Sequence, residues 1–125
     1  MENFFLYKKE TEKPHFILII GSRAWIVPFL DPFEAAKKRF AVEVSPDEAG
    51  IAKPFDSAAD LIEKGRVVVN RGGDGKIDFT VRETSGAVMS GGFVFVLPSW
   101  GIRTKRRLWL LVKSGKPKSK GDKNA

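Results

Sequence analysis

Short runs of apolar residues recur along the chain and are separated by turn residues. The run over residues 15–20 is followed by Gly21 and Ser22, and the run over residues 24–27 ends at Pro28. Runs of about four to eight residues that alternate or are wholly apolar, bounded by such breakers, are typical of β-strands. The pattern predicts strands over residues 4–7, 15–20, 24–27, 40–44, 66–69, 77–81, 93–97 and 108–113.

Two segments have the composition of short helices. Residues 32–38, PFEAAKK, begin with a proline and an acid and end in two lysines, which complements a helix dipole. Residues 57–64 begin at a capping serine and are followed by Gly65, a typical C-terminal stop. Parallel strands would need longer crossovers than most of these connections provide. We therefore expect a mainly β fold, a small antiparallel β-barrel of about seven or eight strands with two short helices.

The segment NRGGDGK over residues 70–76 lies between two predicted strands. Glycine-rich turns can bind anions through backbone amides, but this one has neither the spacing nor the following helix of a phosphate-binding loop. The Asp74-Gly75 pair is a strong signal for a tight hairpin turn. The sequence therefore predicts a hairpin here.

The length of 125 residues suits one hydrophobic core, and we expect a single domain over residues 1–113. Residues 114–125, SGKPKSKGDKNA, have no apolar anchor and are expected to form a disordered basic tail. The chain has no cysteine, which excludes disulfides, thiol catalysis and thiolate metal sites. No basic segment precedes an apolar run at the N-terminus, and no apolar run is long enough to cross a bilayer, so we expect a cytoplasmic protein.

Positive charge is concentrated at the C-terminal end. The net charge is +7, from 22 basic and 15 acidic residues, but residues 101–125 hold nine of the basic residues and one acid. Such an asymmetry points to a polyanion such as nucleic acid as the partner of that end. The alternative is that a lysine-rich tail only aids solubility.

The segment from Trp100 to Trp109 contains four basic residues between two tryptophans. Basic groups hold phosphates and aromatic faces stack on bases, so this composition is typical of nucleic-acid binding. Trp109 lies within an apolar strand and is expected in the core, whereas Trp100 beside Gly101 is expected at the surface. The candidate nucleic-acid-binding residues are Trp100, Arg103, Lys105, Arg106, Arg107, Lys113, Lys116 and Lys118.

His15 is the only histidine, and in a strand it shares its face with Ile17 and Ile19. A metal site needs several converging nitrogen and oxygen ligands, so this pattern favours a structural histidine. The carboxylates are scattered, and no spacing selects a pair for acid and base catalysis. No nucleophile elbow is present, and a serine triad is left open.

Several short motifs stand in the order found in one family. They are FFLYKK at residues 4–9, HFILI at 15–19, AWIVP at 24–28, KRFAV at 38–42, VVNRG at 68–72 and WLLVK at 109–113. They resemble FVVQKH, H-Y-D-x-R-L, SWAVP, KRLAV, VWDRG and WLLIK of the 3′-phosphoesterase domain of bacterial and archaeal DNA ligase D. That domain heals DNA ends in non-homologous end joining, and the resemblance implies its fold over residues 4–113.

The same resemblance implies that the catalytic set is degenerate. The family's first histidine falls on Lys9, its aspartate on Ile17 and its arginine on Ile19, and the histidine of its D-H-P stretch has no counterpart near Pro46. Of the catalytic positions only His15 matches. The family uses Mn²⁺, and one imidazole cannot hold a divalent cation for phosphate ester cleavage. We therefore expect no metal, no cofactor and no catalytic residues.

The resemblance and the charge together predict a non-catalytic relative that binds nucleic acid, in particular DNA ends, in DNA repair. One alternative is an altered phosphoesterase that binds phosphate through Lys9, Lys13 and Arg39. The other is an interaction module that docks on a ligase or polymerase through Phe29, Leu30 and Phe33. The sequence does not choose between DNA and RNA, does not set the oligomeric state, and gives no sign of a membrane partner.

Overall fold

The computed structural model of the protein describes residues 1–28, 38–57, 59–73, 75–102 and 107–113. Strands dominate these residues, and a 3₁₀ turn η1 (Phe55–Ser57) and a one-turn helix α1 (Ser99–Ile102) complete the described elements. The strands are β1 (Glu2–Lys9), β2 (His15–Ile20), β3 (Arg23–Val27), β4 (Lys38–Val44), β5 (Leu61–Arg71), β6 (Lys76–Thr84), β7 (Gly92–Val96) and β8 (Leu108–Lys113).

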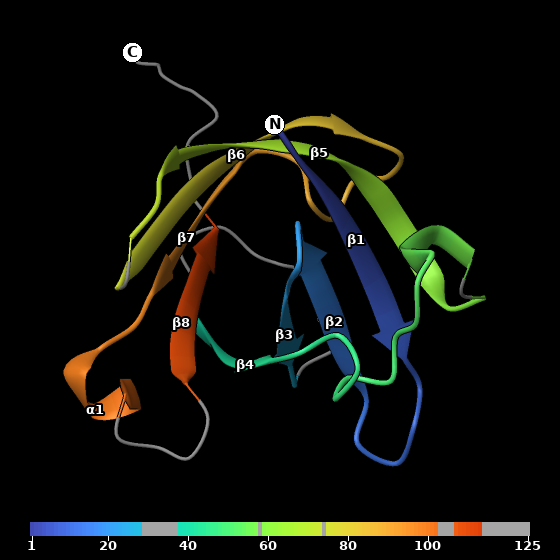
Figure 1. Cartoon of the computed structure of the whole chain (residues 1–125), viewed down its shortest axis with the longest axis horizontal. Coiled ribbons are helices and arrows are strands. Elements are labelled where there is room, and N and C mark those ends of the chain that lie inside the picture. Colours follow the sequence, from blue (N-terminus) through green and yellow to red (C-terminus); the bar gives the residue numbers. More distant parts are fainter. Residues whose placement is uncertain (29–37, 58, 74, 103–106, 114–125) are drawn as a thin grey trace.

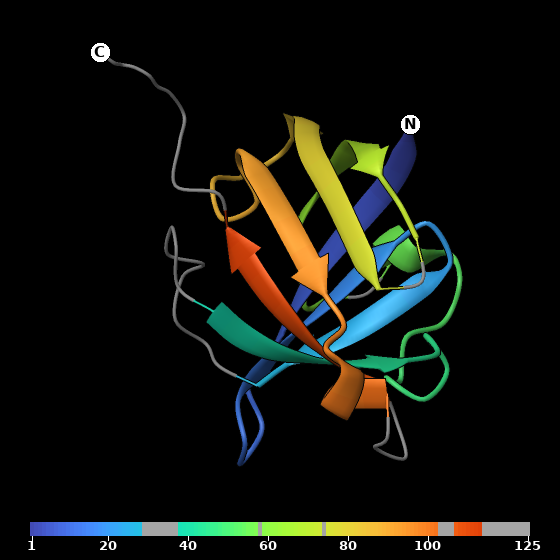
Figure 2. The ribbon, with the colours of Figure 1, turned by 90° about the vertical axis from the view of Figure 1, so that its left-hand side faces the viewer.

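The eight strands form one closed barrel in the order β1-β2-β3-β4-β8-β7-β6-β5 (Figure 1). Strands β1 to β4 are one meander and β5 to β8 are a second, and every neighbouring pair is antiparallel. The two meanders join where β4 pairs with β8 and β1 pairs with β5. Figure 2 shows β6, β7, β8 and β4 side by side across the first of these joins. The prediction of a mainly β antiparallel barrel of about eight strands is confirmed.

Strand β2 shows how the sequence pattern builds two separate apolar clusters. Phe16, Leu18 and Ile20 point into the barrel, because alternate residues of a strand face opposite sides. They pack in an interior core that also contains Trp25, Trp109, Phe79, Phe93 and Phe95. The ring of Trp25 stacks on that of Phe95 with centroids 4.3 Å apart.

The other residues of β2 lie on the outer face of the barrel and are also buried. Ile17 and Ile19 pack with Tyr7 and Val44, and Ile51 from the segment over residues 45–57 packs on them. The Tyr7 hydroxyl donates a hydrogen bond to the carbonyl of Phe55 in the same segment. The segment over residues 45–57, which we call the covering segment, therefore covers the two isoleucines on the face that they share with His15.

Glu63 on β5 is a buried carboxylate that fixes the connection between β6 and β7. It accepts hydrogen bonds from the Thr84 hydroxyl and from the backbone N–H groups of Val88, at 2.9 Å, and Met89, at 3.0 Å. The neighbouring Gly65 is required by a close strand approach, since a Cβ atom there would lie 1.8 Å from the carbonyl oxygen of Glu83.

The helix predicted over residues 57–64 is wrong. Leu61 begins β5 and pairs with Tyr7 of β1, so tertiary pairing overrides the local helix preference of this segment. The helix predicted over residues 32–38 lies outside the described residues except for Lys38, which begins β4. The tail over residues 114–125 also lies outside them. Among the described residues no helix is long and apolar enough to span a membrane.

Candidate functional site

Several strand ends meet at one end of the barrel. The start of β3 lies beside the end of β4, where Ala24 pairs with Val44, and Val42 pairs with Leu108 at the start of β8. The hairpin between β5 and β6 and helix α1 after β7 belong to the same end. We call this the Arg23 end and define it by Arg23, Glu43, Gly73, Trp100 and Arg107.

Arg23 is held in place by a carboxylate and two aromatic rings. Its Nε donates to Glu43 Oε2 at 3.0 Å, and its guanidinium carbon lies 5.1 Å from the ring centre of Trp25 and 5.6 Å from that of Trp109. The other carboxylate oxygen of Glu43 accepts a hydrogen bond from Trp109 Nε1 at 2.9 Å. The terminal nitrogens of Arg23 have no partner among the described residues. An arginine fixed in this way retains a planar pair of donors for a ligand.

A pocket of about 230 Å³ opens beside Arg23. Its lining residues come from the N-terminus, the β2–β3 turn and the β5–β6 hairpin: Glu2, Ile20, Gly21, Ser22, Arg23, Trp25, Val69, Gly72, Gly73 and Ile77. The indole nitrogen of Trp25 is buried and has no hydrogen-bond partner among the described residues. A buried donor without an acceptor is costly and calls for an explanation. The predicted hairpin at residues 70–76 is confirmed and forms one wall of this pocket.

Trp100 lies on α1 with 46% of its surface exposed, as the sequence predicts for this ring. Its ring meets that of Phe40, which is 47% exposed, edge to face at 6.2 Å. Helix α1 lies against the start of β8 (Figure 1), where a Cβ atom at Gly101 would come within 2.2 Å of the Leu108 carbonyl oxygen. Only glycine permits this approach, which holds helix α1 against the start of β8.

The structure separates the predicted nucleic-acid-binding residues. Arg107 is exposed and lines a second hollow together with Arg23, Ser45 and Glu48. Lys113 lies at the other end of β8, about 20 Å away by the usual strand rise, with its ammonium 5.8 Å from the ring centre of Phe93. The remaining predicted residues, Arg103, Lys105, Arg106, Lys116 and Lys118, lie outside the described residues.

His15 lies at the opposite end of the barrel from Arg23. Its Nδ1 is 2.8 Å from the carbonyl oxygen of Lys13, and in the ladder it pairs with Lys9, whose ammonium forms an ion pair with Asp60. Within the described ranges, no group of three or more histidine, aspartate or glutamate side chains is placed to hold a metal ion.

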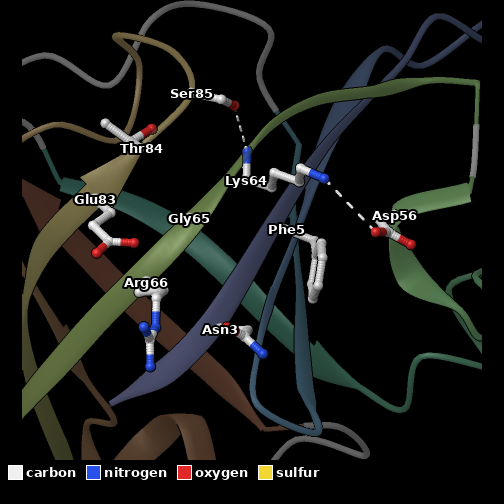
Figure 3. A pocket seen from close by; sticks show the side chains of 9 residues that line it. All are labelled: Asn3, Phe5, Asp56, Lys64, Gly65, Arg66, Glu83, Thr84 and Ser85. Carbon is white, nitrogen blue, oxygen red and sulfur yellow. Dashed lines mark hydrogen bonds and ion pairs between the residues drawn. The ribbon is translucent and has the colours of Figure 1, made fainter.

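A further hollow lies on the outer face of β1, β5 and β6 (Figure 3). Lys64 and Arg66 contribute positive charge there, and Asp56 and Glu83 contribute negative charge. The Lys64 ammonium is 3.7 Å from the Asp56 carboxylate, and its backbone N–H donates to the Ser85 hydroxyl at 3.0 Å. Its opposed charges give no preference for a polyanion, and the exposed pair of Trp100 and Phe40 rings lies at the Arg23 end, which therefore remains the stronger candidate.

No model of a known protein family matches the chain, and no curated protein sequence matches it significantly. The sequence pattern placed Trp100 and Arg107 among the candidate residues but did not single out Arg23 and Glu43, which the structure brings to the same end of the barrel. The alternation of Arg23 and Trp25 along a strand could have suggested that both point into the barrel. The position of Glu43 beside them depends on the pairing of β3 with β4, which a strand pattern alone does not give.

Proposed function

We propose that this protein binds nucleic acid through the Arg23 end and does so without catalysing phosphate ester cleavage. The observation that carries the proposal is the exposed Trp100 ring, which contacts Phe40 and is followed in the sequence, after two intervening residues, by the basic run of residues 103–107. Aromatic rings beside basic groups bind single strands, because bases stack on the rings while the cations neutralise phosphates.

We further propose that the chain is a relative of the 3′-phosphoesterase domain of DNA ligase D that acts on DNA ends in repair and end joining. This rests on the ordered motifs in the sequence. The non-catalytic part of the proposal is supported by Ile17 and Ile19, which are buried under the covering segment at positions where the resemblance implies an acid and an arginine. A working site on that face would need those positions to be open and charged.

The test is fluorescence anisotropy with a labelled single strand, a labelled duplex and a 3′-recessed duplex. Neutralising about six phosphates predicts an affinity that falls by about three orders of magnitude between about 50 and 200 mM salt. Replacing Arg103, Lys105, Arg106 and Arg107 by glutamine is expected to weaken binding of all three probes and to flatten this salt dependence.

A matched control removes the same number of charges elsewhere. Replacing the exposed Lys13, Lys64, Arg66 and Arg82 by glutamine changes the net charge equally but leaves the Arg23 end intact. If both fourfold variants bind equally well, the basic run is not the binding surface. No binding of any probe at low salt would overturn the proposal. Release of phosphate from a 3′-phosphate end in the presence of Mn²⁺ would overturn its non-catalytic part.

A further inference from the structure

Two residues that line the pocket beside Arg23 have donors without a partner among the described residues. The guanidinium of Arg23 is fixed through its Nε by Glu43, which leaves its terminal nitrogens without a partner among the described residues. The indole N–H of Trp25, whose side chain is 1% exposed, is likewise unpaired within the part of the chain that the structure describes. Folding has therefore buried or fixed two donor groups in residues that line one pocket, and the described part of the chain supplies no acceptor for them.

The same pocket has one acceptor on its rim and apolar walls. The Glu2 carboxylate lies over Gly21, since a Cβ atom there would come within 2.8 Å of Glu2 Oε1. Ile20, Val69 and Ile77 supply the apolar walls. These walls and polar groups suit a ligand with an apolar body and a polar edge that carries both acceptors and donors.

Charge argues against a simple anion in this place. One arginine faces Glu2 at the rim and Glu43 behind it, so a phosphate or sulfate would meet two carboxylates with a single cation. A nucleobase is neutral and offers hydrogen-bond acceptors to arginine and donors to glutamate along one edge, as guanine and cytosine both do. The volume of about 230 Å³ is below the range typical of pockets for drug-sized ligands, and suits one base.

We propose that this pocket receives one unpaired nucleobase of the bound strand, an inference that rests on the nucleic-acid-binding function proposed above. Arg23 donates to the base, and Glu2 accepts from it. A base paired in a duplex has its edge occupied and its faces covered by its neighbours, so only an unpaired base enters. The Arg23 end then prefers single strands, loops and frayed ends to intact duplex.

The experiment compares a labelled single strand with a strand of equal length and charge in which the bases are replaced by abasic sites. Gly73→Leu places a large apolar side chain in the pocket. The backbone tolerates this change, because Gly73 does not have a left-handed φ and the nearest atom to a Cβ there is the Lys76 carbonyl oxygen at 3.9 Å. Arg23→Gln removes the donors, and Arg66→Gln on the outer face is the matched control. We expect Gly73→Leu and Arg23→Gln to lose about 5- to 100-fold in affinity for the strand with bases and little for the abasic strand.

The control variant is expected to behave as the wild type on both strands. If the preference for bases is unchanged in both Gly73→Leu and Arg23→Gln, the pocket does not receive a base, although nucleic-acid binding itself stands. If no strand binds at low salt, the function proposed above fails instead.

A second measurement needs neither variants nor a polynucleotide. Guanosine 5′-monophosphate and cytidine 5′-monophosphate are titrated into the ¹⁵N-labelled protein, and the indole N–H signal of Trp25 is followed, with Trp25→Phe to assign it. A saturable shift of that signal, larger than the shift with ribose 5-phosphate, supports the proposal. Equal responses to the nucleotides and to the sugar phosphate overturn it.

Discussion

Two glutamates on neighbouring halves of the barrel bind their partners in opposite ways. Glu63 is 2% exposed, and its carboxylate accepts hydrogen bonds from a hydroxyl and two backbone N–H groups of one turn. Glu43 accepts from the indole of Trp109 and from Arg23, which keeps further donors. The first network is closed, because its donors come from the end of β6 and from the turn that follows, which the carboxylate holds in place. The second is open, because it positions a cation that has remaining hydrogen-bonding capacity.

The difference distinguishes a carboxylate that completes a structural network from one that belongs to a candidate binding site. A closed network has a structural role, since its donors and acceptors are satisfied within the fold. An open network at a barrel mouth, beside a pocket and exposed aromatic rings, has the features expected of a binding site. The contrast makes opposite predictions for stability and for binding.

Glu63→Ala is expected to have the largest effect on stability. It leaves the backbone N–H groups of Val88 and Met89 without an acceptor in a buried place, which lowers the free energy of unfolding by about 2–4 kcal/mol. Denaturant unfolding followed by tryptophan fluorescence measures this loss. Glu83→Ala, on the exposed side of β6, is the control and is expected to change stability by less than about 0.5 kcal/mol. Equal losses in the two variants would show that the Glu63 network is not closed as described.

The hydrogen bond from the Tyr7 hydroxyl to the Phe55 carbonyl is a second interaction satisfied within the fold, and it can be tested without a mutation. Burial and the nearby Asp60 and Asp56 carboxylates raise the pKa of the Tyr7 phenol from 10.0 to about 12. Because the pKa is raised in the folded state, the contribution to stability is present below pH 10 and is lost as the pH rises from about 10 to about 12. The phenolate cannot donate to the Phe55 carbonyl, so ionisation also releases the covering segment.

The chain has a single tyrosine, so the phenolate absorbance of the whole protein reports Tyr7 alone. We expect its titration to have a midpoint near pH 12 in the folded protein and near pH 10 in denaturant. Tyr7→Phe removes the hydrogen bond and is expected to cost about 1–2 kcal/mol at neutral pH. A midpoint near pH 10 in the folded protein would mean that the ring is neither buried nor bonded.

Much of the fold followed from the sequence because strands have a short period that local composition reveals. Strand β2 and strand β8 begin and end at the predicted residues, since turn residues flank clear apolar runs. The helix prediction over residues 57–64 was wrong because local composition there does not reveal the structure. The segment's alanines and its Leu61-Ile62 pair suit a helix, and only the pairing of β5 with β1 makes residues 61–64 the start of a strand.

The candidate site was less predictable because it depends on register and closure. Trp100 could be identified as exposed from its place beside a glycine at a loop, and Trp109 as buried from its apolar strand. Arg23, Glu43 and Trp25 come together only when β3, β4 and β8 pair in the observed registers. Lys113 was grouped with Arg107 because the two are close in sequence, but an extended strand separates them, with Arg107 just before β8 and Lys113 at its end.

Glu43→Gln is expected to affect binding more than stability. Glutamine can still accept a hydrogen bond from Trp109 or Arg23, so we expect a stability loss of about 1 kcal/mol from the partly exposed ion pair. The glutamine amide has one acceptor oxygen where the carboxylate has two, so the guanidinium is held less firmly over the two rings, and the preference for strands with bases over abasic strands is expected to fall about 3- to 10-fold. Glu83→Gln, which removes the same charge from the outer face, is the control in the same anisotropy assay. If Glu43→Gln keeps the wild-type preference for strands with bases, Glu43 does not position a binding group, and the proposed difference between the two glutamates is wrong.

Trp100→Ala is expected to have the smallest effect on stability and still to weaken binding. The ring is about half exposed and touches Phe40 at the surface, so its removal changes the free energy of unfolding by less than about 0.5 kcal/mol. Loss of a stacking platform is expected to lower affinity for a single strand with bases by about 5- to 100-fold and to spare the abasic strand. Trp100→Phe keeps an aromatic face and is expected to retain most of the affinity. If Trp100→Ala binds both strands as the wild type does, the exposed ring is not a platform for bases, and binding at the Arg23 end rests on its cations alone.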